Sequence, residues 1–532
     1  MDTKVHDVED VKDYKATEHD EDLPPELATA LKAGAKGFTK SADVAMRLFE
    51  NHDFNMIVDP EEEKRVVRKI DLIILPLIAV NYIFFYIDKT TLSYAALYGI
   101  REDLKLHGTE YNWLSSIFYF GFMAWAFPTN FLMQKFPLGK YLGANIMLWG
   151  FFLMLQAACS SFATLAVLRF LSGAAEACAD PAFMLITQMW YTRRQQPLRI
   201  GLWYLGNGFG IAVGGLLGYG IGHIKGSLPS WRYEFIIIGA LCFVWGIVII
   251  ILMPDSPVTA KFLTDHEKRI TVIRLKDNQT GVENKQLKPY QVWEAFKDPK
   301  LYMFYILGTV CNLPNGGISN FGTLIVQGIF KGDKLMAAVM QAPYGAFIAL
   351  SIGLCVYLND RFPNNNRCKF VLIFLCPNIA GAFGLCFLDQ SNHAGRYICY
   401  LLTGPYNAAF VLILSLQIAN TAGHTKKVVT NAVLFLGYCT GNIAGPFFYK
   451  TSQAPGYKLG IWSMIVAHLL EACVICLFWF MLKNENKRRD RVQGHEGLTA
   501  EELVEKRKGE GYERTAFEDL TDRENLNFRY IY

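Results

Sequence analysis

The chain has 532 residues, of which 52% are hydrophobic, 14% aromatic and 19% charged, and its formal net charge is +4. This composition is too apolar and too poor in charge for a soluble protein of several domains, so we expect an all-α membrane protein embedded in a lipid bilayer. The basic residues stand in short blocks beside apolar runs, a pattern that membrane orientation produces, and nucleic acid is therefore not an expected partner.

Twelve cysteines are scattered along the chain, most of them inside apolar runs. Cys473 and Cys476 form one C-x-x-C pair, but no second pair or nearby histidine completes a metal site. We therefore expect the cysteines to be small buried hydrophobes, with no disulfide framework, no metal and no cofactor.

Residues 1–64 are polar, and ten acidic residues stand among the first 26. This composition predicts a disordered, solvent-facing N-terminal arm. Apolar runs of about 20 residues, the length that crosses a bilayer, then recur twelve times. They lie near 70–88, 113–133, 141–159, 162–190, 200–222, 235–253, 301–325, 336–358, 369–388, 397–418, 428–449 and 460–482.

The spacing of these runs predicts two six-helix halves, residues 65–253 and 301–482. A polar inter-half loop, 254–300, separates them, and a charged tail, 483–532, follows. Lysine and arginine gather on one side of the expected membrane, in blocks such as 64–69, 426–427 and 483–491. By the positive-inside rule both termini and the inter-half loop should be cytosolic.

The two halves resemble each other weakly. A basic residue followed by Phe-Pro ends the second span of each half, at Lys135 and Arg361, and Arg169-Phe170 and Arg396-Tyr397 open the fourth and tenth spans. Internal repeats of this kind are typical of pseudo-symmetric transporters, whose site lies between the halves near the middle of the membrane.

The fourth apolar run, Leu165 to Trp190, contains three charged residues, Arg169, Glu176 and Asp180. On a continuous helix the three would lie within roughly 40° of one another on one face. A charge at mid-bilayer costs on the order of 2.5–3.5 kcal/mol, so this face should line a bundle interior or a watered cavity.

Each of the three has a candidate role and an alternative. Arg169 can hold a carboxylate through its planar fork of donors, or form a structural ion pair between helices. Glu176 is the candidate proton carrier, because burial favours its neutral form, or it is a permanently ionised partner of Arg169 or Lys89. Asp180 is expected to be a gate residue or a loop partner of Arg193 or Arg194.

Asp88 and Lys89 close the first apolar run. Lys89 is a candidate substrate ligand, but it could also extend to the outer membrane surface, and Asp88 is the second candidate for the proton site. Asn81 and Tyr82 recur with Lys89 at helical spacing and could form a substrate-binding stripe, although such stripes usually serve packing.

The second half offers further candidates. Asn312 and Asn315 flank Pro314 in the seventh span, where Pro314 and Gly316-Gly317 should interrupt the helix beside a cavity or a tight protein contact. Tyr406 and Asn407 in the tenth span could line the same cavity or pack between helices. His468 and Glu471 in the last span could pair, with peripheral packing the favoured interpretation.

Several motifs carry a family resemblance. They are YIDKTTLSYAALYGI (86–100), RFLSGAAEACADPAF (169–183), MWYTRRQQPLRIGLWY (189–204), WRYEFIIIGA (231–240), MPDSP (253–257) and YKLGIW (457–462). Together they resemble the fungal anion:cation symporter branch of the major facilitator superfamily, which includes permeases for allantoate, nicotinate, pantothenate and related carboxylates.

The resemblance covers roughly residues 65–490 and implies twelve transmembrane helices in two pseudo-symmetric six-helix halves. It also implies a binding Arg and Glu seven residues apart in the fourth span, which Arg169 and Glu176 match, and a basic residue late in the first span, where Lys89 stands. The usual Asp-Arg gate pair after the second span is replaced by Gln134-Lys135, whereas Asp360-Arg361 keeps the pair in the second half.

We therefore expect a monomeric, multi-pass carrier of the plasma membrane that imports a small organic anion with protons by alternating access. No set of residues suited to covalent catalysis stands out, so an enzyme is not expected. A proton-coupled exporter and a nutrient sensor without transport are the alternatives.

Overall fold

The computed structural model describes residues 58–192, 195–276, 288–362, 366–494, 521–526 and 528–532. Most of the N-terminal arm predicted over residues 1–64 lies outside these ranges. The first described helix, α3, begins earlier than the first predicted span, at Pro60, where the Asp59 side chain accepts a hydrogen bond from the amide of Glu61. The described part of the chain is helical and contains no β-strand.

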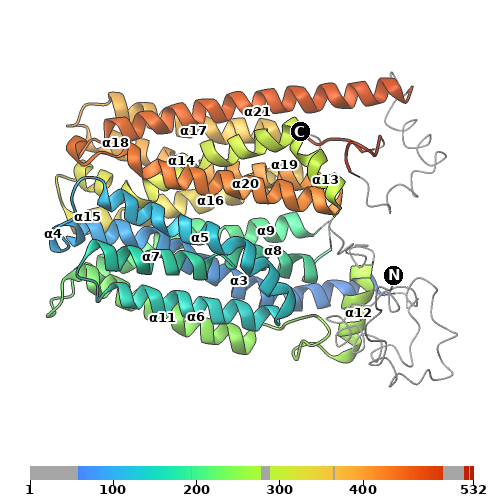
Figure 1. Cartoon of the computed structure of the whole chain (residues 1–532), viewed down its shortest axis with the longest axis horizontal. Coiled ribbons are helices and arrows are strands. Elements are labelled where there is room, and N and C mark those ends of the chain that lie inside the picture. Colours follow the sequence, from blue (N-terminus) through green and yellow to red (C-terminus); the bar gives the residue numbers. More distant parts are fainter. Residues whose placement is uncertain (1–57, 193–194, 277–287, 363–365, 495–520, 527) are drawn as a thin grey trace, which may run out of the picture. The chain divides into compact units, whose positions relative to one another are not determined.

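The N-terminal half forms one group of helices (Figure 1). Its elements are α3 (Pro60–Leu97), α4 (Ile100–Asp103), α5 (Glu110–Lys135), α6 (Leu138–Gln156), α7 (Phe162–Glu176), α8 (Ala179–Trp190), α9 (Gln196–Tyr204), α10 (Gly206–Gly222) and α11 (Ser230–Leu252). The inter-half loop contains α12 (Asp265–Lys276) and α13 (Pro289–Phe296).

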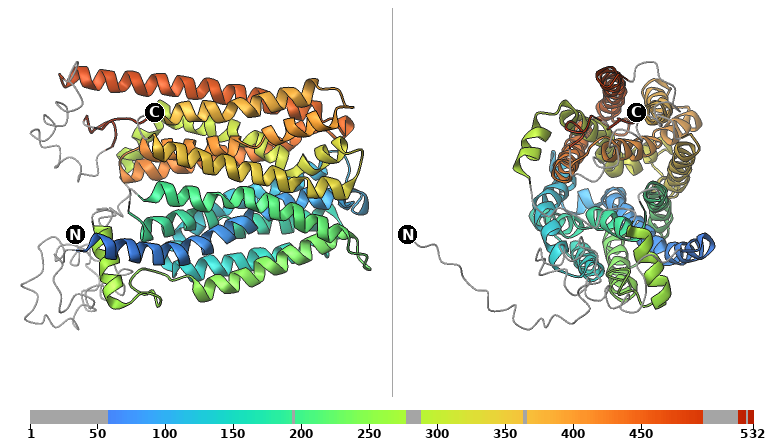
Figure 2. Two further views of the ribbon diagram at one scale, coloured as in Figure 1. Left: turned by 180° about the vertical axis from the view of Figure 1, so that it is seen from behind. Right: turned by 90° about the vertical axis from the view of Figure 1, so that its right-hand side faces the viewer.

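The C-terminal half forms a second group beside the first, as both views in Figure 2 show. Its elements are α14 (Pro299–Ile329), α15 (Lys334–Val339), α16 (Gln341–Arg361), α17 (Arg367–Phe387), α18 (His393–Leu402), α19 (Tyr406–Ala419), α20 (His424–Ala444), η2 (Gly445–Phe448), η3 (Thr451–Gln453) and α21 (Lys458–Val492). We call the end of the bundle where α3 begins the terminal end, and the opposite end the far end.

All twelve predicted spans are helical, which confirms the all-α fold. Ten of them are long and apolar enough to cross a membrane. The other two, α5 and α14, are 26 and 31 residues long but carry more polar side chains. Large apolar side chains are exposed on the outer surface, among them Phe127 at 87% and Ile251 at 72%, as expected where the solvent is lipid.

The fourth span is not one helix, contrary to the sequence-based expectation. α7 ends at Glu176 and α8 begins at Ala179, so Asp180 belongs to a different segment from Arg169. Pro181 explains the break, because its ring lacks an amide hydrogen and clashes with the carbonyl of Ala177 in a continuous helix. The tenth span breaks in the same way, between α18 and α19, just before Pro405.

The expectation for the seventh span was also wrong, since α14 runs unbroken through Pro314. The glycines there serve close packing instead. A Cβ on Gly316 would lie 2.7 Å from the carbonyl oxygen of Asn442 in α20, and one on Gly317 would lie 2.3 Å from the ring of Tyr449. A larger residue at either position would push these neighbours away.

The halves touch along α10 and α16. A Cβ on Gly208 would lie 2.5 Å from the carbonyl oxygen of Gly345, and a Cβ on Gly345 would lie 2.4 Å from that of Gly208. The two backbones are therefore in direct contact, and only glycine fits at either position.

Hydrogen bonds also join the halves near the far end. Ser93 of α3 bonds Thr323 of α14 at 2.7 Å, and the Tyr111 hydroxyl of α5 donates to the Asn320 carbonyl at 2.7 Å. The Asn112 side chain donates to the carbonyl of Pro446. The far end is thus closed by contacts between α3, α5, α14 and η2.

Candidate functional site

Two glycine contacts place the charged residues of α7 beside α5. A Cβ on Gly173 would lie 2.0 Å from the carbonyl oxygen of Phe118, and a Cβ on Gly121 would lie 2.0 Å from that of Phe170. Because the backbones approach so closely, the side chain of Arg169 reaches the inner faces of α3 and α5 rather than lipid.

Arg169 is buried, with 3% of its surface exposed. Its Nε donates to the carbonyl oxygen of Leu114 at 3.4 Å, and its guanidinium lies 5.2 Å from the centre of the Phe118 ring. Nη1 lies 3.9 Å from Oδ1 of Asp88, which is an ion pair but too long for a hydrogen bond. Nη1 has no hydrogen-bond partner among the described residues, so it can donate to a ligand.

Asp88 is fully buried at the centre of this group. Its Oδ2 accepts a hydrogen bond from Nε1 of Trp149 in α6 at 2.9 Å. Its Oδ1 faces Arg169 and has no hydrogen bond among the described residues. The indole therefore fixes one carboxylate oxygen and leaves the other toward the guanidinium.

Glu176 is the last residue of α7 and is 2% exposed. Within the described chain, neither carboxyl oxygen has a hydrogen-bond partner of good geometry. Its carboxyl group does interact with that of Asp88, and a hydrogen bond between the two would need a proton on one of them. A buried acid without a fixed partner is suited to gaining and losing a proton.

Lys89 does not extend to the membrane surface, because its side chain is buried and points into the bundle. Its Nζ donates to the hydroxyl of Tyr438 in α20 at 2.6 Å and lies 3.8 Å from the centre of the Phe85 ring. Since Tyr438 belongs to the C-terminal half, this hydrogen bond joins the halves at the site itself.

A small cavity of about 10 Å³, room for roughly one water molecule, lies among these groups. Its lining residues come from α3, α5, α7 and α14: Asp88, Lys89, Ser115, Phe118, Tyr119, Arg169 and Asn320. The hydroxyl of Ser115 has no partner among the described residues, so it is a further group that a ligand could use. Three of the predicted residues, Arg169, Lys89 and Asp88, therefore share one cavity.

The other predicted binding residues lie elsewhere. Asn81 is buried, and its amide has no hydrogen bond among the described residues, while Tyr82 packs against the rings of Trp203 and Tyr204. Asn312 bonds its own helix at the carbonyl of Gly308.

Two of the predicted asparagines form cross-helix pairs. Asn315 donates to the side-chain oxygen of Asn442 and accepts from the hydroxyl of Tyr406, both at 2.8 Å. Asn407 accepts a hydrogen bond from Asn207 of α10 at 2.8 Å, which links the two halves.

The predicted gate residues are only partly described. Asp180 stands in the first turn of α8, whereas Arg193 and Arg194, its expected partners, lie outside the described residues. Asp360 and Arg361 are exposed at the end of α16. Among the described residues, no group of three or more His, Cys, Asp or Glu side chains could hold a metal ion.

Sequence reasoning missed several partners. Trp149, Tyr438 and Asn207 each form a hydrogen bond with a predicted residue. The sequence indicates only that each is a polar group in the middle of an apolar span and must therefore find a hydrogen-bond partner. His468 and Glu471 are fully buried and pair at 3.2 Å, so the expectation of peripheral packing was wrong. Cys376, Cys473 and Cys476 are exposed rather than buried.

Twelve helical spans in two halves, ten of them apolar enough to cross a membrane, with a charged cavity where the halves meet, are typical of a membrane transporter. The family model of the Major Facilitator Superfamily matches residues 78–446, and the chain belongs to that superfamily.

Similar proteins agree with this assignment. The chain is 40% identical to an uncharacterized transporter of Schizosaccharomyces pombe, covering 92% of this chain and 90% of that protein. It is 32% identical to the allantoate permease of Saccharomyces cerevisiae, covering 95% and 93%, and 33% identical to a thiamine pathway transporter of the same yeast, covering 89% and 87%. The fold also matches a crystal structure of a bacterial homolog of the human lysosomal transporter Spinster, with a TM-score of 0.57, 15% identity, and coverage of 77% of this chain and 96% of that one.

Proposed function

We propose that this transporter imports a small organic anion together with a proton by alternating access. The observation that carries the proposal is the placement of Glu176, a buried acid without a hydrogen-bonded partner of its own, beside the Asp88–Arg169 ion pair. Arg169 offers a free Nη1 donor to an anion, and Glu176 offers a place for the proton.

The charges of the site explain how the two cargoes would be coupled. Arg169 and Lys89 carry two positive charges, and ionised Asp88, Glu176 and Asp180 carry three negative ones, because Asp180 also interacts with Lys89 and Glu176. A proton on Glu176 removes the net negative charge, which in a place of low dielectric would repel an anion. Binding of the anion in turn favours the proton, because thermodynamic coupling is reciprocal.

The substrate class follows from the same groups. A guanidinium, a free hydroxyl and an asparagine around a small cavity suit a carboxylate with further polar groups, such as allantoate, ureidosuccinate, nicotinate or pantothenate. The similarity to an allantoate permease supports this class. We place the protein in the plasma membrane with its terminal end in the cytosol, as a monomer.

The coupling is tested with Glu176→Gln, which mimics the protonated acid and cannot release a proton. We expect exchange of labelled substrate across the membrane to persist while accumulation against a gradient is lost. Counterflow and net uptake are measured side by side over a range of external pH. Uphill uptake by the Gln variant would show that the proton site lies elsewhere, with Asp88 the next candidate.

The direction and the substrate are tested together by uptake of a labelled carboxylate panel into an uptake-deficient yeast, with and without a protonophore. Importing activity that the protonophore abolishes supports the proposal. Efflux driven by protons would favour the exporter, and binding without any movement of label would favour the sensor.

A further inference from the structure

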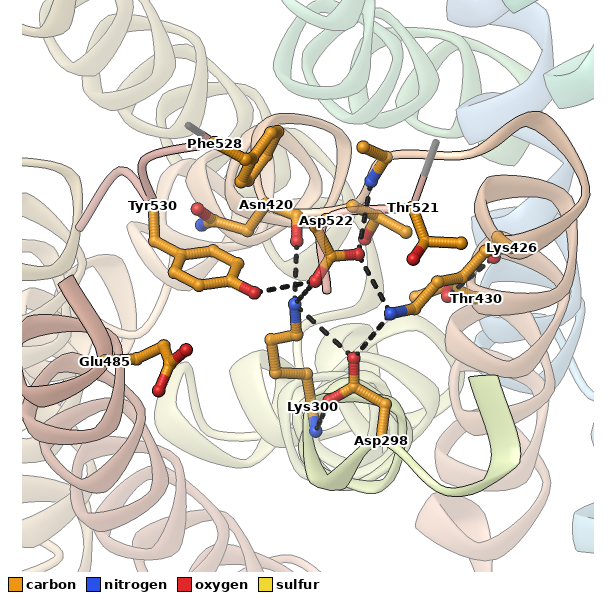
Figure 3. A network of polar contacts seen from close by, with 12 residues as sticks. Asp298, Lys300, Asn420, Lys426, Thr430, Glu485, Thr521, Asp522, Phe528 and Tyr530 are labelled. Carbon is orange, nitrogen blue, oxygen red and sulfur yellow. Dashed lines mark hydrogen bonds and ion pairs between the residues drawn. The ribbon is translucent and has the colours of Figure 1, made fainter. Parts of the chain in front are cut away.

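The last described residues return to the bundle and dock on its terminal end, within the C-terminal half. Residues 521–526 and 528–532, which we call the C-terminal segment, lie against the beginnings of α14 and α20 and the end of α21 (Figure 3). Sequence reasoning treated this region only as a charged tail.

The contact centres on Asp522, whose side chain is fully buried. It forms ion pairs with Lys300 of α14 and, at 2.9 Å, with Lys426 of α20, and it accepts a hydrogen bond from the hydroxyl of Tyr530 at 2.7 Å. Asp298 lies 2.8 Å from Lys426 and 3.4 Å from Lys300. Two lysines thus contact two buried aspartates, and the segment supplies one of these two carboxylates.

The backbone of the segment is also recognised. Arg489 of α21 donates to the carbonyl oxygens of Asp522, Asn525 and Phe528 at 2.8, 3.1 and 2.8 Å. The amide groups of Asn420 and Asn486 each form two hydrogen bonds with the backbone, at Ile531 and Tyr530 respectively. Hydrogen bonds to the backbone of an extended segment are the usual way in which a protein binds such a peptide.

The segment also reaches the inter-half loop. Thr521 donates to Glu294 of α13 at 2.9 Å, and Lys426 bonds the other carboxylate oxygen of Glu294 at 2.9 Å. Hence α13, α14, α20 and α21 all meet at one short stretch of chain.

We propose that the C-terminal segment is an intramolecular ligand whose docking joins the terminal ends of α13, α14, α20 and α21 into one rigid unit. Without Asp522, buried Lys300 loses its short ion pair and, among the described residues, keeps only the 3.4 Å ion pair with Asp298, which Lys426 also contacts at 2.8 Å. Loss of one partner of a buried ion pair is strongly unfavourable. The helix ends then separate and the inter-half loop loses its anchor. The occupant is this chain's own segment, and the interaction does not depend on which substrate is carried.

The test compares two full-length variants that each remove one carboxylate from the segment. Asp522→Asn removes the buried charge, whereas Glu524→Gln removes an exposed charge two residues away and is the matched control. A fluorescent peptide of residues 521–532 is added to each purified protein. Because the native segment should leave the site only in the Asp522→Asn protein, we expect the peptide to bind that variant at least about tenfold more tightly than the wild type or the control.

Rigidity is measured on the same three proteins by hydrogen exchange of α13 and the first turns of α14 and α20. We expect faster exchange in Asp522→Asn alone, with partial reversal by the peptide. Equal peptide affinity for all three proteins, or unchanged exchange in Asp522→Asn, would overturn the proposal. An Asp522→Asn peptide that bound as tightly as the native one would also overturn it, since the buried carboxylate is its centre.

Discussion

Arg169 is held mainly by a backbone carbonyl and an aromatic ring, and its contact with Asp88 is a long one. This arrangement keeps the guanidinium in place without saturating it. In the proposed mechanism an anion would therefore bind Arg169 without first displacing a short ion pair, whose rupture would leave a buried charge alone.

Arg169→Lys should abolish saturable uptake while leaving surface expression intact. Lysine keeps the positive charge but loses the Nε hydrogen bond to Leu114 and the planar fork. Arg396→Lys, at the corresponding position of the tenth span, is the control and should retain uptake, because Arg396 does not line the cavity. Unchanged uptake kinetics in Arg169→Lys would refute the anion-binding role.

Trp149→Phe should raise KM by roughly tenfold, because a hydrogen bond to a charged group contributes about 1.5–3 kcal/mol. Without the indole N–H, Asp88 is free to turn both oxygens toward Arg169 and compete with the substrate. Trp245→Phe is the matched control, since the Trp245 N–H makes no hydrogen bond among the described residues. Equal KM values in the two variants would separate Trp149 from substrate binding.

At this scale the sequence reveals charges but not their partners. Arg169 and Glu176 could be predicted because a charge in an apolar span needs an interior place. The partners Trp149, Tyr438 and Asn207 depend on how each helix is rotated about its axis, and no local pattern sets that rotation.

At the scale of helices, the break in the fourth span determines the position of Glu176. Glu176 lies in the last turn of α7, next to residues whose backbone does not continue the regular helical hydrogen bonds. Interrupted helices of this kind occur at transporter sites, because irregular backbone is tolerated only beside a cavity or within protein.

Gly173→Ala should destabilise the protein by about 1–3 kcal/mol, the usual cost of overpacking, because the added methyl group collides with the backbone of α5. Gly220→Ala in α10 is the control, as nothing lies within 4 Å of the position its Cβ would take. Thermal unfolding of the purified proteins measures both. Equal melting temperatures would mean that α5 and α7 are less tightly packed than described.

The apolar runs predict where the twelve helical spans lie, but not their full extent, since α3 begins ten residues before its run and α21 ends ten residues after it. Helix breaks are harder to predict, because whether a proline breaks a helix depends on the packing around it. Helices break just before Pro181 and Pro405, which stand at the starts of α8 and α19, whereas Pro314 stays inside α14, which packs closely against α20. The sequence contains the proline in each case, but the packing decides its effect.

For the whole molecule, orientation in the membrane remains a prediction from the positive-inside count. Protease added to intact cells should not cut an epitope inserted after Asn278, nor one appended to either terminus. Permeabilised cells are the control and should show cleavage at all three sites. Cleavage at Asn278 in sealed cells would reverse the topology and the assignment of the far end to the outside.

Docking of the C-terminal segment should not respond to pH in the physiological range. Burial alone would raise the pKa of Asp522, but Lys300 and Lys426 outweigh it and hold that pKa below the ordinary value. A carboxyl whose pKa is lower in the docked state than in the free state stabilises docking fully when the pH is above its free-state pKa. This stabilisation is lost only as the pH falls through the docked-state pKa. The other charged groups at the site are Asp298, Glu294 and Arg489.

The affinity of the 521–532 peptide for the Asp522→Asn protein should therefore be constant from about pH 8 to about pH 5 and fall only below about pH 4. Fluorescence anisotropy across this range measures it. A midpoint between pH 6 and pH 7 would mean that a group other than Asp522 controls docking.

In the proposed alternating-access cycle, the direct backbone contact between Gly208 and Gly345 would be the pivot about which the two halves rotate. Atoms beside a pivot move little during such a rotation, and atoms at the ends of the bundle move far. The Asn207–Asn407 hydrogen bond stands next to this contact and can persist throughout a cycle, whereas the Ser93–Thr323 bond at the far end must break each time that end opens. A cross-link at the first position should thus be tolerated, and one at the second should arrest the carrier.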